Sequence, residues 1–180
     1  MADIMLDLET MSTKNNAAII AIGAVAFSEH DGISAEFYHE ISLESCQKHG
    51  LHIDANTVLW WIAQSKDAQD KFKDNSQADS LECGLIAFSE FCGKHLTGQI
   101  WGNGSTFDNV ILRNAYEVTS NEYPAAFWND ACYRTVRGLN PSVEFNRVGT
   151  YHYALDDAKT QALHLIKILN NKTRFDSANS

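Results

Sequence analysis

The chain has 180 residues and a mass of 20.1 kDa, a length typical of one domain with its own hydrophobic core. Apolar residues make up 44% of it and charged residues 21%, as in an ordinary soluble globular protein. The net charge of −9, with a pI near 5.1, excludes a cationic nucleic-acid-coating protein, a basic membrane-surface module and a histone-like binder, but not an enzyme that handles polyanions through bound metal.

Three antiparallel strands are predicted at the start of the chain, over residues 4–9, 17–27 and 33–42. In the first strand, polar and apolar residues alternate, so that Asp7 and Glu9 lie on one face of the sheet. The second strand is rich in Ile, Val and Ala, and its Gly23 marks a bulge or the close approach of another segment.

The rest of the chain alternates between predicted helices and short strands. Residues 44–79 are polar and predicted to be helical in pieces, with Asp54 or Asn56 as the cap of a short helix that carries Trp60 and Trp61. Apolar spacing predicts longer helices over residues 80–96 (capped by Ser80), 106–116 and 154–169. Short strands are predicted at residues 99–101 and 126–132. This order describes an α/β sandwich around a mixed sheet, with one domain over residues 1–172 and a polar tail over residues 173–180.

The four cysteines form no CxxC pair and no cluster with zinc-ligand spacing. Cys83 and Cys92 lie in a helical apolar pattern, which predicts buried thiols. No signal peptide and no apolar stretch near the roughly 20 residues of a membrane span are visible. We therefore expect a reduced, cytoplasmic protein with no membrane partner.

The charge is divided unevenly along the sequence. Residues 1–112 contain 6 Lys or Arg against 16 Asp or Glu, whereas residues 113–174 contain 8 against 6. Within the second part, Arg134, Arg137 and Arg147 are candidates for contacts with phosphate or with a partner. A mixed solvated surface explains the same distribution, so both interpretations stay open.

Acidic residues stand at three places where predicted strands or helices begin or end. Asp7 and Glu9 share one strand face, Asp108 lies in a first helical turn after a glycine-rich turn, and Asp157 follows His152 into the last helix. Hard cations such as Mg²⁺ prefer carboxylate ligands, and a cluster of carboxylates needs such cations to offset its repulsion. The pattern indicates a metal site; a solvated strand edge and ordinary helix caps are the alternatives.

Three segments together carry a resemblance to a known family. They read Asp-Leu-Glu-Thr at 7–10, Asn-Gly-Ser-Thr-Phe-Asp at 103–108 and His-Tyr-Ala-Leu-Asp-Asp at 152–157. In order, spacing and predicted context they resemble the three-motif signature of the DEDDh 3′–5′ exonucleases. The resemblance implies a ribonuclease H-like three-layer α/β fold, with a central mixed five-stranded sheet flanked by helices. Trp60-Trp61 and Arg134-Thr135 further resemble a compact branch associated with phages and prophages.

The resemblance also implies a set of site residues. The carboxylates that bind two divalent metal ions, Mg²⁺ or Mn²⁺, are then Asp7, Glu9, Asp108 and Asp157, with His152 as the general base. Asp157 is preferred to Asp156 because the family motif is His-x-Ala-x-x-Asp, and because adjacent helical residues point about 100° apart.

Six further residues are candidates for contacts with the substrate: Thr10, Met11, Trp61, Asn103, Phe107 and Arg134. Thr10 and Met11 follow the metal pair, where the family places the terminal nucleotide. Trp61 and Phe107 offer surfaces on which bases stack, with ordinary core aromatics as the alternative. Asn103 either bonds the terminal nucleotide or only forms its turn.

The implied activity is hydrolysis of phosphodiester bonds at the 3′ end of single-stranded DNA or RNA by a two-metal mechanism with a histidine base. One alternative is an exoribonuclease that trims or degrades short RNA rather than DNA. Another is a non-catalytic binding subunit with a nuclease fold. A ribonuclease H-type endonuclease is disfavoured because its site does not require the His-x-Ala-x-x-Asp arrangement. By analogy with related nucleases, a homodimer is also expected.

Overall fold

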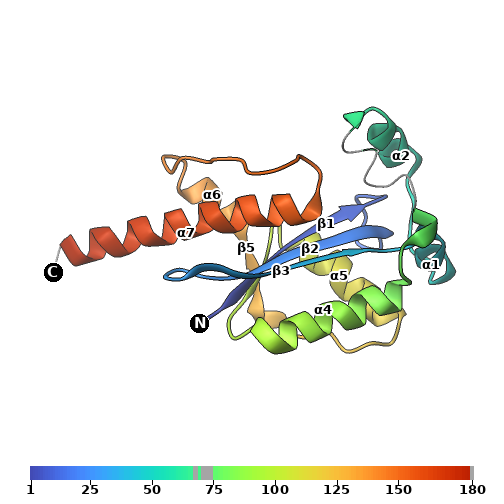
Figure 1. Cartoon of the computed structure of the whole chain (residues 1–180), viewed down its shortest axis with the longest axis horizontal. Coiled ribbons are helices and arrows are strands. Elements are labelled where there is room, and N and C mark those ends of the chain that lie inside the picture. Colours follow the sequence, from blue (N-terminus) through green and yellow to red (C-terminus); the bar gives the residue numbers. More distant parts are fainter. Residues whose placement is uncertain (67–68, 70–74, 179–180) are drawn as a thin grey trace.

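The computed structural model describes residues 1–66, 69 and 75–178. A mixed five-stranded sheet with the order β3-β2-β1-β4-β5 forms its centre (Figure 1). The strands are β1 (Asp3–Thr10), β2 (Ile19–Ser28), β3 (Gly32–Glu40), β4 (Ile100–Gly102) and β5 (Asp130–Cys132). The α-helices are α1 (Leu43–Lys48), α2 (Ala55–Ile62), α4 (Leu81–His95), α5 (Asp108–Val118), α6 (Tyr133–Leu139) and α7 (Ala154–Ala178). The predicted α/β fold with a mixed five-stranded sheet is confirmed.

The central strand β1 pairs antiparallel with β2 and parallel with β4. Its alternate residues enter two separate cores: Leu6 and Leu8 pack in the cluster that includes α4 and α5, while Met5 packs with α7. Helix α7 therefore covers one face of the sheet, and α4 and α5 cover the other (Figure 1). Because the side chains of a strand alternate, Asp7 and Glu9 lie on the α7 face.

Gly23 is where α7 comes closest to the sheet. This residue of β2 pairs with Asp7 of β1. A Cβ atom at Gly23 would lie 2.2 Å from the backbone carbon of Ala154, the first residue of α7. The close approach predicted from the sequence is confirmed, and it brings the start of α7 beside Asp7.

Other elements differ from the prediction at their ends. Asp54 and Ser80 cap α2 and α4 as expected. Helix α7 runs to Ala178 rather than ending at residue 169, so most of the predicted tail is helical; residues 179–180 lie outside the described residues, as do 67–68 and 70–74 of the predicted helical pieces. Strand β5 is shorter than predicted, because Phe127–Asn129 forms a 3-10 turn like that at Asn75–Gln77.

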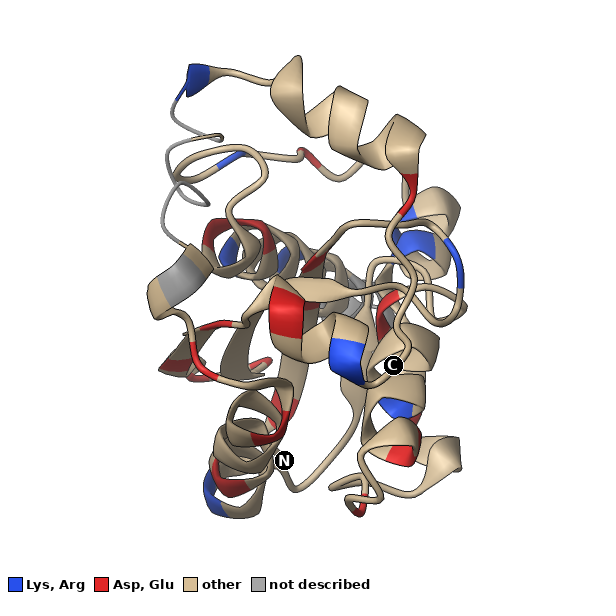
Figure 2. Ribbon diagram, turned by 90° about the vertical axis from the view of Figure 1, so that its right-hand side faces the viewer, with Lys and Arg blue, Asp and Glu red and all other residues tan. Residues whose placement is uncertain are grey.

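The structure also bears on the predicted burial of two cysteines and on the distribution of charge. Cys92 is buried as predicted, but Cys83 is exposed, because it lies on the outer side of α4. Acidic and basic residues are interspersed along the ribbon rather than gathered in one basic track (Figure 2). Within the described part of the chain, no helix is both long and apolar enough to cross a membrane.

Candidate active site

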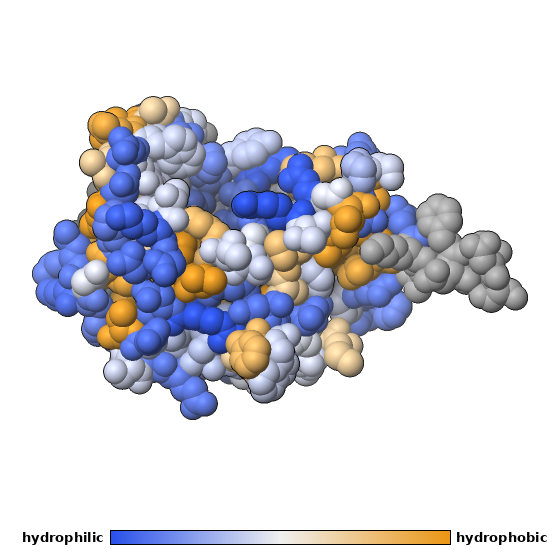
Figure 3. Space-filling view, turned by 180° about the vertical axis from the view of Figure 1, so that it is seen from behind, coloured by the Kyte–Doolittle hydropathy of each residue, from blue (hydrophilic) through white to orange (hydrophobic). Residues whose placement is uncertain are grey.

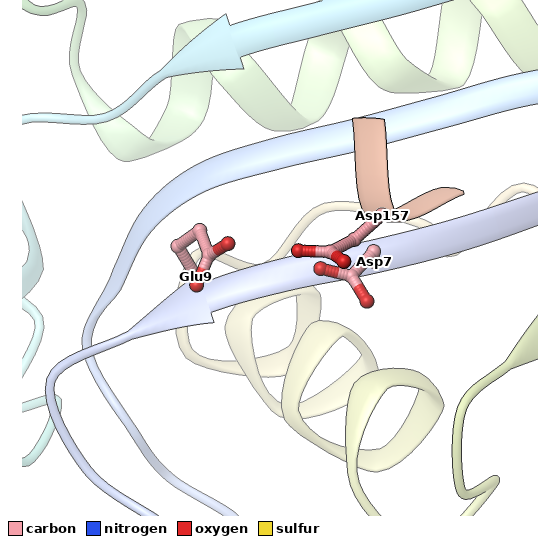
Figure 4. A group of neighbouring side chains, drawn as sticks. All are labelled: Asp7, Glu9 and Asp157. Atoms are coloured by element: carbon pink, nitrogen blue, oxygen red, sulfur yellow. The ribbon is translucent and has the colours of Figure 1, made fainter. Parts of the chain in front are cut away.

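Three carboxylates meet near the carboxyl end of β1. Asp7 and Glu9 come from β1, and Asp157 comes from the first turn of α7 (Figure 4). One ligand atom from each of the three lies within 4.8 Å of the others. Asp7 and Asp157 point toward one another, so residues 150 positions apart in sequence form one acidic group.

The three carboxylates line a cavity with a volume of about 240 Å³, called here the carboxylate cavity, and Asp108 lines it as well. It is 2% exposed, and its two carboxylate oxygens accept hydrogen bonds from the backbone N–H groups of Leu8 (3.2 Å) and Asn103 (2.9 Å). These bonds tie the start of α5 to β1 and to the turn after β4. Asp108 is thus held beside the three-carboxylate group rather than within it.

Burial raises the pKa of the Asp7, Glu9 and Asp108 carboxyl groups, and repulsion between carboxylates adds to the shift at Asp7 and Glu9. Burial, followed by the nearby charges of Asp157 and Asp108, raises the pKa of Glu9 to about 8. The same two effects, with Asp108 and Glu9 as the main neighbours, raise the pKa of Asp7 well above its ordinary value. Burial raises the pKa of Asp108 to about 7, although its backbone hydrogen bonds oppose the shift. Such a cluster is stabilised when a cation replaces the protons.

The polar atoms around the cluster match an oxygen-ligated cation. Gln161 of α7 donates a hydrogen bond from Nε2 to Oδ1 of Asp7 at 2.7 Å, which fixes that carboxylate. The Oε1 atoms of Glu9 and Gln161 are buried and accept no hydrogen bond among the described residues. Buried oxygens without a partner are costly unless a ligand satisfies them. The all-oxygen donor set is the one that Mg²⁺ and Mn²⁺ prefer, so the residues fit the implied metals.

His152 lines the carboxylate cavity from the loop before α7. Its backbone is in the left-handed region, with φ of 59°, and its N–H donates to Oδ2 of Asp157 at 3.0 Å. Its ring packs edge-to-face against Trp60, with 4.9 Å between centroids, and lies 6.0 Å from Trp61. The imidazole is therefore held between α2 and the carboxylates.

Arg147 organises the loop that carries His152. It forms an ion pair with Oδ1 of Asp157 and donates a second hydrogen bond to the carbonyl of Thr150. Its guanidinium also lies 4.1 Å from the ring centre of Tyr151. The neighbouring Asp156 is turned to the same loop, where it accepts from the N–H of Thr150 at 2.7 Å. Arg147 therefore pairs with a carboxylate of the site, and Asp157, not Asp156, faces the cavity.

A larger cavity of about 550 Å³ adjoins the cluster on the α2 side. Thr10, Trp61 and Phe107 line it together with Glu9 and the exposed Trp60. Trp61 is 6% exposed and donates from Nε1 to the carbonyl of Thr10 at 3.0 Å, so it is both a core residue and part of the cavity wall.

The remaining predicted substrate residues lie in two different places. Asn103 and Arg134 line the carboxylate cavity. Met11 instead packs against buried residues of two core clusters. Gln161 was not predicted, although it lies four residues after Asp157 and therefore on the same face of α7. That spacing is the signal that could have found it.

Comparisons with known proteins agree with this geometry. The nuclease domain of 3′hExo, a DEDDh family member bound to rAMP, superposes with a TM-score of 0.66 at 15% identity, covering 94% of this chain and 92% of that one. E. coli exonuclease I in complex with a dT13 oligonucleotide has a TM-score of 0.69 at 11% identity, covering 98% of this chain but 43% of that one. Both likenesses confirm the ribonuclease H-like fold.

Sequence relatives add the class of enzyme. A protein of Enterobacteria phage T4 named exodeoxyribonuclease is 27% identical over 160 residues, which cover 75% of this chain and 70% of the relative. Fold, motif order and relatives define a 3′–5′ exonuclease of the DEDDh class. More particularly, residues 2–169 match the family described as the 3′-5′ exoribonuclease Rv2179c-like domain, and the chain belongs to that family.

Proposed function

We propose that this exonuclease removes nucleotides from the 3′ end of single-stranded nucleic acid by a two-metal mechanism with His152 as the general base. The observation that carries the proposal is the convergence of Asp7, Glu9 and Asp157 within 4.8 Å beside a cavity that His152 also lines. A lone acidic residue at a helix start has structural explanations, whereas three converging buried or half-buried carboxylates have a strong chemical one.

The metal ligands in this proposal are Asp7, Glu9, Asp108 and Asp157. When bound, two Mg²⁺ or Mn²⁺ ions supply the positive charge that lowers the pKa of water and stabilises the leaving 3′ oxygen. Gln161 orients Asp7 through its hydrogen bond of 2.7 Å. The backbone N–H of His152 holds Asp157, so a carboxylate ligand and the base keep a fixed relation.

His152 takes the proton of the attacking water on an imidazole nitrogen. Histidine is the side chain that most often serves as a general base, and such bases contribute about 10²–10⁴-fold to the rate. The edge contact with Trp60 and the left-handed backbone limit how the ring can turn. The surrounding chain thus presents the base to the cavity rather than to open solvent.

The 3′-terminal nucleotide occupies the 550 Å³ cavity beside α2. Phe107 and Trp60 offer ring surfaces for its base, and such stacking is worth about 1–3 kcal/mol per base without regard to sequence. In this proposal, Thr10 and Asn103, which line the two cavities, supply polar contacts to the sugar and phosphate, while the buried Trp61 supports the wall from the core. Met11 packs against buried residues that include Trp61 and so supports the same wall.

Both sugars occur among the relatives. The family is described as exoribonuclease, the phage relative is named exodeoxyribonuclease, and the two solved relatives hold rAMP and dT13. We therefore propose a single-strand exonuclease for which both DNA and RNA are candidate substrates. Its preference is measured on DNA and RNA strands of matched sequence. An enzyme that trims short RNA is the second candidate, favoured by the family description.

The test is nucleotide release from 3′- and 5′-labelled strands with Mg²⁺ or Mn²⁺. The wild type should shorten strands stepwise from the 3′ end, while Asp7→Ala should lose activity by more than about 100-fold, since even residues that only support a metal ligand cost 10–100-fold. His152→Ala should lose about 10²–10⁴-fold. Full activity of Asp7→Ala, or a loss below about tenfold for His152→Ala, would contradict the assignment. Binding of strands without hydrolysis would favour a non-catalytic subunit.

Three broader expectations also stay predictions: the homodimer, the cytoplasmic location and the single domain over residues 1–172. Light scattering of the purified chain measures the first, and fractionation of the source cells measures the second. Limited proteolysis measures the third, since a continuous domain should resist cleavage from its start to the middle of α7.

A further inference from the structure

A second polar cavity opens on the other side of the carboxylate group. It has a volume of about 720 Å³, within the range of ligand-binding cavities, and lies between α6 and the loop over residues 140–145. Asn103 and Arg134 line both this cavity and the carboxylate cavity, so the two adjoin one another. In the view from behind, hydrophilic residues lie in the hollow between the α2 end and the α6 end of the molecule (Figure 3).

The lining of this cavity is cationic. Arg134 and Arg137 line it, and both side chains are exposed; Glu144 is the acidic residue at the same wall. The guanidinium of Arg137 lies 4.3 Å from the ring centre of Phe145 and forms a side-chain hydrogen bond with Tyr133, so that it is held at the cavity wall; its planar group has five N–H donors, more than this one bond uses. His164 adds no free donor, because its ring nitrogens contact the hydroxyl of Tyr133 and the carbonyl of Val143.

Arg134 stands where this cavity joins the carboxylate cavity. Its guanidinium lies over Gly104, where an added Cβ would be 3.2 Å from Cζ of the arginine, and its charge lowers the pKa of Asp108. Gly104 has φ of 120°, a conformation that favours glycine, and the absence of a side chain there leaves room for the guanidinium. The cation thus sits at the edge of the carboxylate cavity, where the proposed reaction takes place.

The two cavities that flank the carboxylates differ in chemistry, and so do the two sides of the scissile bond. The 3′-terminal nucleoside carries no phosphate beyond the scissile one, and it suits the aromatic cavity beside α2. Each nucleotide on the 5′ side adds a phosphate, and the cationic cavity matches that charge. We propose that the cavity between α6 and residues 140–145 binds the phosphates of the nucleotides on the 5′ side of the scissile bond. This inference rests on the proposed exonuclease activity and adds the direction in which the strand lies.

The test compares two substrates. Oligothymidylate has nucleotides on the 5′ side of the scissile bond, whereas the p-nitrophenyl ester of thymidine 5′-monophosphate has none. Arg137→Gln should lower kcat/KM for the oligomer by roughly tenfold, mainly through KM, because one charged hydrogen bond to phosphate is lost. It should also make the salt dependence of KM shallower by about 0.7 in log–log slope. The nitrophenyl ester should show no comparable loss.

Two further variants control this experiment. Ser142→Glu adds a negative charge to the cavity without touching the stack of Arg137 on Phe145, and it should cause the same loss for the oligomer alone. Lys94→Gln removes one positive charge from α4, on the opposite face of the sheet, and should leave both substrates unaffected. An equal loss on both substrates, or no loss on the oligomer, would overturn the proposed phosphate cavity. A wild-type protein that cleaves neither these two substrates nor an RNA strand of matched sequence would instead overturn the exonuclease function and this inference with it.

Discussion

The two halves of the carboxylate site are held in place by different means. The strand half, Asp7 and Glu9, lies on β1, whose register is fixed by β2 on one side and β4 on the other. The loop half, residues 147–157, ends in the first turn of α7 and is held by side-chain hydrogen bonds. A strand places alternate residues on one face by geometry alone, whereas a loop needs a partner for each turn. The strand half is therefore built into the sheet, and the loop half depends on a few contacts that can be removed singly.

The loop half also contains two residues in unusual backbone conformations. Gly149 has φ of 68°, and an added Cβ there would lie 2.1 Å from the carboxylate carbon of Asp156. His152 has φ of 59° without being glycine. A non-glycine residue in this region persists only where its surroundings hold it. His152 is held by Asp157 and by the ring of Trp60, and Arg147 in turn pairs with Asp157. These contacts place the proposed base.

The largest effect is expected where the two halves touch. In Gly23→Ala, the new Cβ would meet the backbone of Ala154 at 2.2 Å, so the start of α7 must move away from β1. We expect the free energy of unfolding to fall by about 1–3 kcal/mol, the usual cost of overpacking. Nucleotide release should fall by at least about 100-fold, since a displacement of the order of 1 Å has that effect on a positioned site. Chemical denaturation and the labelled-strand assay measure the two.

Gly93→Ala is the matched control. Gly93 lies in α4, and an added Cβ there meets nothing within 4 Å. This variant should keep its activity and gain up to about 1 kcal/mol in stability, because alanine restricts the unfolded chain. If Gly23→Ala were as active as Gly93→Ala, the contact between β2 and α7 would not position the site.

The difference between the strand half and the loop half also explains which features could be predicted from the sequence. Alternation in residues 4–9 was enough to place Asp7 and Glu9 on one face, and helical spacing was enough to put Asp108 and Asp157 at helix starts. That Asp157 meets Asp7 depends on the packing of α7 over β2, which is a long-range property. From sequence it followed only from the family resemblance, with Gly23 as a local sign of close approach.

Local sequence patterns could not predict the contacts that hold the loop half. Arg147 reads as a surface cation, because nothing in its neighbours shows that it reaches Asp157 ten residues later. Helix α6 was missed because seven residues with no long apolar repeat give a weak signal. The end of α7 was placed too early, because polar residues after position 169 have no apolar stripe although the backbone continues as a helix.

Removal of Arg147 should affect turnover but not metal binding, because its contacts lie in the loop half. Arg147→Gln loses the ion pair with Asp157 and the bond to Thr150, so the loop that carries His152 loosens. We expect kcat to fall by about 10–100-fold, as for other residues that orient site groups. Mn²⁺ affinity, measured by calorimetry, should not fall, because a competing positive charge has been removed from the carboxylates.

Arg147→Lys separates charge from geometry. Lysine keeps the positive charge but lacks the planar fork that serves Asp157 and Thr150 together. Its kcat should therefore lie between those of the wild type and Arg147→Gln. Full activity in Arg147→Gln would show that the loop half is held without this residue.

A smaller effect is expected at Gln161, which links α7 to the strand half. Gln161→Leu removes the hydrogen bond to Asp7 and should weaken Mn²⁺ binding by about tenfold, the lower end of the range for residues that orient a metal ligand. Leu163→Ala, on the partly exposed side of α7, is the control and should bind Mn²⁺ as the wild type does. Unchanged binding in Gln161→Leu would mean that the register of β1 alone orients Asp7.

A last effect is expected in the pH dependence of stability of the metal-free protein. Burial and neighbouring carboxylates raise the pKa of Glu9 from 4.5 to about 8, so the folded state holds a proton that the unfolded chain releases. The stability contributed by this proton is complete below pH 4.5 and is lost as the pH rises toward 8. In EDTA, the Tm of the wild type should therefore fall between pH 5 and pH 8 relative to that of Glu9→Gln. Mn²⁺ at pH 8 should raise the Tm of the wild type more than that of the variant, which lacks one of the proposed metal ligands. A Tm difference that is constant with pH would show that Glu9 is already ionised in the folded chain and that the strand half tolerates its charges without a cation.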